Sequence, residues 1–142
     1  MGYYLDLEYC EVQIPRKLFP KLVKGINKYR KKHGSNNNPA SILPITGTDE
    51  EIKTEFSDNS FDIELLADRL VVNGTTGEWK MGDWVTDFWQ FIAPSVKSGS
   101  YLEVEGEDHV KWRWYFVCGK FLEFHPSIVW ELESVYRIKG AV

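Results

Sequence analysis

The chain has only two cysteines, three histidines and no long apolar run. Cys10 and Cys118 are too few for a disulfide-stapled scaffold or a four-cysteine zinc site. We expect two buried free thiols, with one disulfide as the alternative. No apolar run approaches the roughly 18 residues that a membrane helix needs. Residues 1–12 also lack the basic and apolar regions of a signal peptide, so we expect a cytoplasmic protein without membrane contact.

Motifs for cofactor chemistry are missing as well. Gly74 and Gly77 bracket a short glycine-containing segment, but the lysine and helix that complete a phosphate-binding loop do not follow it. No serine lies in a nucleophile elbow. The histidines are scattered, and Glu107, Asp108 and His109 are more typical of a solvated hairpin tip than of a metal site. We therefore expect no cofactor and no metal ion.

Aromatic residues are abundant, with six Trp, seven Tyr and eight Phe in 142 residues. A chain of this length buries about two thirds of its unfolded surface. We expect residues 1–142 to form a single domain, because the length matches the usual domain size. Aromatic side chains fill cores, and they are also the residues that anchor protein interfaces.

The clearest pattern lies in residues 100–125, where apolar and polar residues alternate and turn residues separate the segments. When the first two segments are aligned antiparallel, Leu102 faces Trp114 and Glu103 faces Arg113. A slip by one residue would set charges against aromatic rings, so the pattern favours this one register. The sequence therefore predicts a β-hairpin with one apolar and one polar face.

A third strand is predicted to follow the turn at 119–121 and to end at His125. In the register that we expect, Phe116 opposes Phe124 and Tyr115 opposes His125. The same register opposes Val117 to Glu123 and Cys118 to Leu122. It places Glu123 and His125 on the polar face and Phe124 in the core wall.

Residues 3–14 alternate as a half-buried strand, with Tyr3, Leu5, Leu7 and Tyr9 on its inner side. Helical spacing predicts two main helices. In the first half of the chain we expect a helix over 18–33 that begins near Phe19 or Pro20, a loop over 34–48, and a short helix from the Thr48 and Glu51 capping box to Phe56, with a strand as the alternative. Strands are expected over 61–65 and 70–72, with a helical turn over 66–70 as an alternative, and 77–81 is expected to pair back onto 70–72. A helix over 84–97, capped by Asp83 and shortened by Pro94, and at least one more strand within 128–138 complete the prediction.

These elements predict an α+β fold. An antiparallel sheet, formed by the N-terminal strand and the C-terminal meander, would carry the two main helices on one face. The other face of the sheet would be polar.

The polar face of the meander is the first candidate site. Its predicted binding residues are Tyr101, Glu103, Glu105, Arg113, Tyr115, Glu123 and His125. Cross-strand ion pairs on a solvated sheet explain most of this pattern. A catalytic interpretation would use His125 as a general base, Glu103 as a second carboxylate and Arg113 as an anion clamp.

Charge is distributed very unevenly along the chain. Residues 16–32 contain eight bases and no acid, whereas residues 49–108 contain fifteen acids and four bases. A solvated helix face is the ordinary explanation, and contact with a phosphate backbone or an acidic partner is the alternative. The residues of the predicted basic patch are Lys21, Lys24, Lys28, Arg30, Lys31 and Lys32.

Together these observations predict a small non-enzymatic protein-binding module that docks on a partner protein. Immunity proteins and phage-type anti-defence inhibitors are the classes that fit such a chain. Two alternatives stay open. One is nucleic-acid or nucleotide binding through the basic helix at 16–32, and the other is a hydrolase-type enzyme on the polar face of the 100–125 sheet.

Overall fold

The described part of the chain forms one six-stranded sheet and three α-helices. The computed structural model describes residues 2–34, 39–133 and 135. Its main elements, in chain order, are β1 (Leu5–Pro15), α1 (Phe19–His33), α2 (Asp49–Asp58), β2 (Phe61–Leu65), β3 (Arg69–Thr75), α3 (Asp83–Ile92), β4 (Tyr101–Gly106), β5 (Lys111–Val117) and β6 (Lys120–Phe124).

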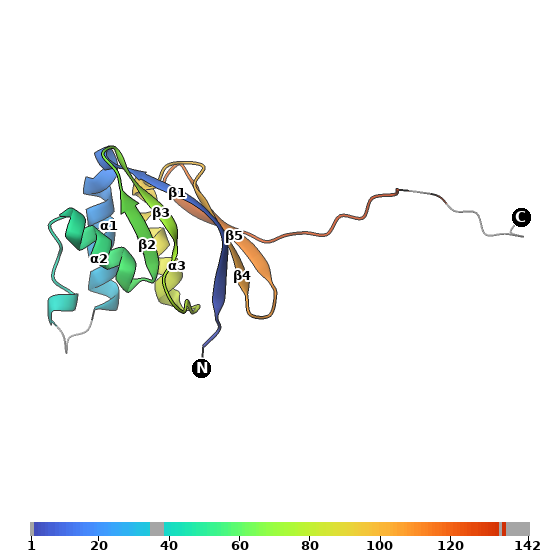
Figure 1. The fold of residues 1–142 in the computed structure, drawn as a ribbon, viewed down its shortest axis with the longest axis horizontal. Coiled ribbons are helices and arrows are strands. Elements are labelled where there is room, and N and C mark those ends of the chain that lie inside the picture. Colours follow the sequence, from blue (N-terminus) through green and yellow to red (C-terminus); the bar gives the residue numbers. More distant parts are fainter. Residues whose placement is uncertain (1, 35–38, 134, 136–142) are drawn as a thin grey trace, which may run out of the picture.

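All neighbouring strands in the sheet are antiparallel, and their order is β2-β3-β1-β4-β5-β6. The long β1 joins the two halves, because it pairs with β4 through its first part and with β3 through its second. The predicted α+β fold is confirmed. Figure 1 shows the helices grouped at one side of the molecule and the chain after β6 leading away on the other.

The helices begin close to where the sequence placed them. The first starts at Phe19, and the second has the predicted capping box, with Thr48 as N-cap and Glu51 at the third helical position. The third differs slightly, because Gly82 rather than Asp83 is the N-cap. Pro94 lies in a short 3-10 turn, Ala93–Ser95, which ends this helix before 97.

A glycine allows α1 and α3 to approach closely. A Cβ on Gly25 would lie 2.3 Å from the carbonyl oxygen of Phe91. The neighbouring Leu22 and Ile26 are fully buried, as are Ile92 and, on the sheet, Ile14. The apolar stripes of the two helices therefore form one core with the inner face of the sheet.

A bulge in β1 changes which side chains point inward. The pairing with β4 shifts between Leu7 and Tyr9, so Glu8 is the extra residue. One extra residue exchanges the two faces of a strand. Beyond the bulge Val12 and Ile14 are buried, whereas Tyr9 is 62% exposed. The prediction that Tyr9 faces inward is therefore wrong.

Trp79 is a core residue that the sequence pattern did not reveal. It comes from the irregular segment before α3, and its ring centroid lies 5.2 Å from that of Phe61 and 6.2 Å from that of Trp114. The backbone N–H of Leu5 donates to its carbonyl oxygen, and Lys80 bridges to Tyr4. Segment 77–81 thus contacts the start of β1, and its predicted pairing with 70–72 is wrong.

The two C-terminal hairpins differ in how well their registers were predicted. Between β4 and β5 the expected pairs are confirmed, including Leu102 with Trp114. Between β5 and β6 the prediction is wrong by three residues, because Phe116 pairs with Phe121. The loop is the two-residue turn of Cys118 and Gly119 (φ 49° and 80°), and positive φ at both positions is what a type I′ turn requires.

A shift by an odd number moves every β6 side chain to the opposite face of the sheet. Phe124 therefore pairs with Arg113 and lies on the polar side, whereas Glu123 pairs with Trp114 on the core side. The further strand expected within 128–138 is also absent from the described residues, since 125–133 and Val135 contain neither helix nor strand. Residues 136–138 lie outside the described part of the chain.

Candidate functional site

The sheet face that carries no helix, called the open face here, collects most of the predicted binding residues. Cross-strand pairing puts Tyr101 opposite Tyr115 and Glu103 opposite Arg113. Glu105 lies opposite Lys111 in the next row. These side chains alternate along β4 and β5 with buried ones, so the strands themselves fix their common orientation.

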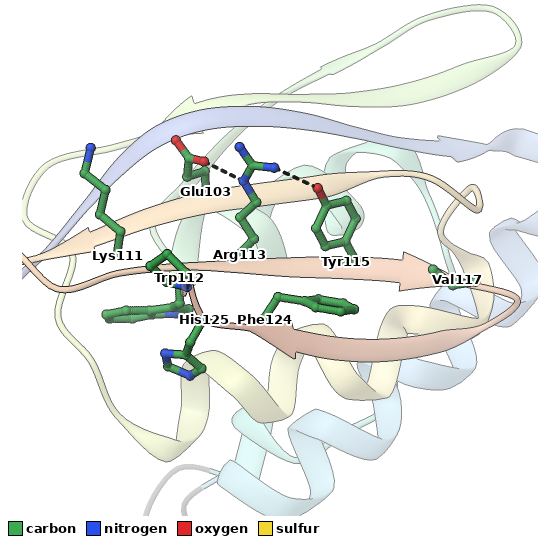
Figure 2. Close-up of a pocket in the computed structure, with 9 residues that line it drawn as sticks. Glu103, Lys111, Trp112, Arg113, Tyr115, Val117, Phe124 and His125 are labelled. Atoms are coloured by element: carbon green, nitrogen blue, oxygen red, sulfur yellow. Dashed lines mark hydrogen bonds and ion pairs between the residues drawn. The ribbon is translucent and has the colours of Figure 1, made fainter. Parts of the chain in front are cut away.

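Arg113 is the centre of the polar contacts on this face. Its Nε donates to Glu103 Oε1 at 2.5 Å, and its Nη1 donates to the Tyr115 hydroxyl at 3.0 Å. Figure 2 shows these two contacts as dashed lines that run from Glu103 through Arg113 to Tyr115. The Glu103 carboxylate raises the pKa of Arg113, so the guanidinium stays charged. Nη2 has no partner within the described residues.

A pocket of about 610 Å³ opens beside this row. Phe124 stands at its side, 51% exposed, with its ring edge-on to Tyr115 at 5.3 Å between centroids. Val117 and Leu122 are also exposed on this side of the sheet. The residues that line the pocket are Glu103, Lys111, Trp112, Arg113, Tyr115, Val117, Phe124, His125 and Pro126.

Two predicted binding residues take a different position. Glu123 Oε1 accepts a hydrogen bond from Trp114 Nε1 at 2.8 Å, on the core side of the sheet edge. Partial burial would raise the pKa of Glu123, but the Trp114 hydrogen bond and the His125 ring lower it overall. His125 Nε2 lies 2.9 Å from Glu123 Oε2, and its ring is 6.4 Å from that of Trp112. Glu123 and His125 thus form a pair at the edge, apart from the row around Arg113.

The geometry also bears on the hydrolase-type alternative. Glu103, Tyr115 and His125 all line the pocket, as that alternative requires. Glu103 is bonded to Arg113, however, and His125 is paired with Glu123. The side chains named for acid–base roles therefore contact charged neighbours rather than one another.

Next to the pocket the sheet ends in a free edge. β6 is the last strand in the sheet order, and β5 is its one strand neighbour in the described chain. The following segment, 125–133, runs away from the body (Figure 1). It carries exposed apolar side chains, among them Trp130 at 91% exposure, together with Ile128, Val129 and Leu132.

The basic helix keeps part of its predicted patch free. Arg30 forms an ion pair with Glu55, and Lys32 Nζ lies 2.8 Å from Asp87. Burial raises the pKa of Glu55, although the charge of Arg30 acts in the opposite direction. The five other lysines between residues 16 and 32 are exposed, and none of them has an ion pair with a described residue. We call this set the lysine stripe, and its members are Lys17, Lys21, Lys24, Lys28 and Lys31.

Among the described residues, neither the thiols nor the side chains that bind metals form a further site. Both cysteines are free, but the prediction of two buried thiols is wrong, because Cys10 is half-buried and Cys118 is exposed in the β5–β6 turn. Burial raises the pKa of Cys10 to about 12, and its Sγ donates to the Val72 carbonyl. Within the described ranges no three His, Cys, Asp or Glu side chains are arranged to hold a metal ion. None of the helices described has the length and apolar character needed to cross a bilayer.

Comparisons with protein-family models, with curated proteins and with solved structures found no match to this chain. The function is therefore inferred from the geometry and chemistry of the open face and of the lysine stripe.

Proposed function

We propose that the chain is a protein-binding module that docks a partner protein on the open face beside β6. The observation that carries this proposal is a free strand edge next to exposed apolar side chains, of which Phe124 is the largest. A free edge offers unpaired backbone N–H and C=O groups to an extended segment of another chain. Apolar side chains that gather on an otherwise polar face mark an interaction surface.

The pocket specifies the chemistry of the partner segment. An extended segment that pairs with β6 places alternate side chains over the open face, where an aromatic or aliphatic one enters the pocket that Phe124 lines. Arg113 is half exposed and has Nη2 free for a carboxylate of the partner. Aromatic side chains and arginine are the residues that dominate binding energy in protein interfaces.

The proposal is of binding without catalysis, and it includes the biological role expected from the sequence. An immunity protein or an anti-defence inhibitor acts by occupying a surface of its partner. The open face supports such a role because its charged groups are held in fixed positions, with Glu103 on Arg113 and Glu105 near Lys111. Fixed charges of both signs favour one partner over others.

Peptide display tests this function. Twelve-residue segments would be selected against the full chain, and their dissociation constants measured for the unchanged protein and for Phe124→Asp. We expect binding to weaken about tenfold or more, because a hot-spot anchor contributes about 2 kcal/mol or more and about 1.4 kcal/mol corresponds to tenfold.

The matched control is Leu43→Asp, which changes an exposed leucine in the segment before α2. This variant should bind as the unchanged protein does. A library without a binder, or peptides that bind both variants equally, would refute docking at β6.

A second candidate function, nucleic-acid binding, is favoured by the lysine stripe. Lys21 and Lys31 are ten residues apart, which is about 15 Å along a helix, and Lys24 and Lys28 lie between them on the same exposed side. A row of cations complements the continuous negative charge of a phosphate backbone.

Salt dependence tests this second function. We expect a labelled DNA duplex to bind with an affinity that falls steeply as salt increases, with a log–log slope of about −0.9 for each phosphate contacted. The double variant Lys24→Glu, Lys28→Glu should flatten that slope, whereas Lys97→Glu, an exposed lysine before β4, should not. Affinity that is independent of salt would exclude contact with the phosphate backbone.

A further inference from the structure

The segment 127–133 has the pattern of a strand but has no strand partner in the described chain. Ile128, Trp130 and Leu132 alternate with Glu131 and other residues, so one side of an extended conformation is entirely apolar. All three apolar side chains are exposed, and Trp130 almost completely. Such a row of large apolar groups is typical of a segment that binds a surface.

The junction with β6 disfavours a return of this segment onto its own strand. Pro126 has φ fixed near −65°, and the residue before a proline is held extended. Two-residue hairpin turns that suit the twist of a sheet need a positive φ at their first position, which proline cannot adopt. Accordingly the chain continues away from β6 after His125 and makes no turn in the described residues (Figure 1).

The surface beside this junction matches the segment in its apolar character. Pro126 itself lines the pocket, so the segment leaves the molecule at the margin of the groove formed by the pocket and the free β6 edge. A strand that turns Trp130 toward the open face also turns Ile128 and Leu132 toward it, and turns Glu131 toward the opposite face. On β6, Leu122 and Phe124 are exposed on the open face. The apolar row of the segment thus meets apolar groups of the groove.

We propose that residues 127–133 dock into the groove of a second copy of this chain and pair there with its β6, and that the two copies exchange these segments reciprocally. Every copy carries both halves of the contact, so a two-fold dimer uses each of them twice. The exchange rests on the proposed function, because it uses the same groove, and it names an occupant that competes with any other partner. Trp130 is the side chain that enters the pocket.

Sedimentation velocity of the full chain over a range of concentrations tests this exchange. We expect the unchanged protein to form dimers, and Trp130→Glu and Phe124→Asp each to weaken association about tenfold or more. Both replaced side chains are exposed in the single chain, so neither variant should lose its fold. Leu43→Asp, which changes an exposed leucine in the segment before α2, is the control and should dimerise normally.

Mixing the two variants gives the sharpest result. The Trp130→Glu copy keeps an intact groove and the Phe124→Asp copy keeps an intact segment, so their mixture should form a heterodimer through one remaining contact. Several outcomes overturn the exchange: a monomer at every concentration, variants that associate as the unchanged protein does, no heterodimer in the mixture, or a monomer whose Trp130 is shielded by its own β6. If the chain is monomeric but displayed peptides still require Phe124, the exchange fails and the docking function stands.

Discussion

At the scale of single residues, Glu51 shows how one carboxylate fixes the start of a helix. Its Oε1 accepts hydrogen bonds from the Thr46 hydroxyl at 2.6 Å and from the backbone N–H groups of Gly47 and Thr48 at 3.1 and 3.0 Å. The Thr46 hydroxyl, followed by the Thr48 backbone, lowers the pKa of Glu51 to about 2. All of these donors favour the charged form of the side chain.

Acid should therefore weaken this junction in a defined pH range. Because the pKa of Glu51 is lower in the folded chain than its ordinary value of 4.5, its contribution to stability is present above pH 4.5 and is lost as the pH falls toward about 2. We expect the variant Glu51→Gln to lose less stability over that range than the unchanged protein does. Urea unfolding at several pH values measures the difference, with Glu50→Gln in the same helical turn as the control. Parallel pH curves for Glu51→Gln and the unchanged chain would contradict this role.

At the scale of elements, the two C-terminal hairpins show what a sequence pattern can determine. The β4–β5 register follows from sequence because Glu103 meets Arg113 only when the apolar residues also match. In β6 apolar residues occur at both odd and even positions, such as Phe121 and Leu122, so alternation cannot choose the face. The turn decides instead, and the glycine at the second position of a two-residue loop was the available signal.

Stability measurements distinguish the observed register from the predicted one. In the predicted register both Phe116 and Phe124 belong to the core, whereas in the structure Phe116 is fully buried and Phe124 is half exposed. We expect Phe116→Ala to lower the free energy of unfolding by about 3–5 kcal/mol, and Phe124→Ala to lower it by about 0.5 kcal/mol or less. Equal losses in denaturant unfolding would show that both rings lie in the core.

At the scale of the whole molecule, the candidate site could be predicted only in part. The row from Tyr101 to Tyr115 follows from the β4–β5 pattern, and the structure places it as expected. The apolar part of the groove depends on the β6 register, which the pattern did not determine. The basic patch lost Arg30 to Glu55 and Lys32 to Asp87, since these acids come from other helices and no local pattern shows that they are near.

The open face and the lysine stripe are therefore two separate surfaces on one fold. The first joins a free strand edge to an apolar pocket, and the second is a row of cations along α1 and the turn before it. They favour different partners, because strand pairing depends little on salt whereas phosphate contacts depend on it strongly.

Hydrogen–deuterium exchange with a displayed peptide that binds the chain tests the docking claim most directly. Strand addition would engage the backbone amides on the outer edge of β6, so their exchange should slow when the peptide is added, while exchange in α1 stays unchanged. Protection confined to α1, or no change in β6 at saturating peptide, would contradict a docking site at this edge.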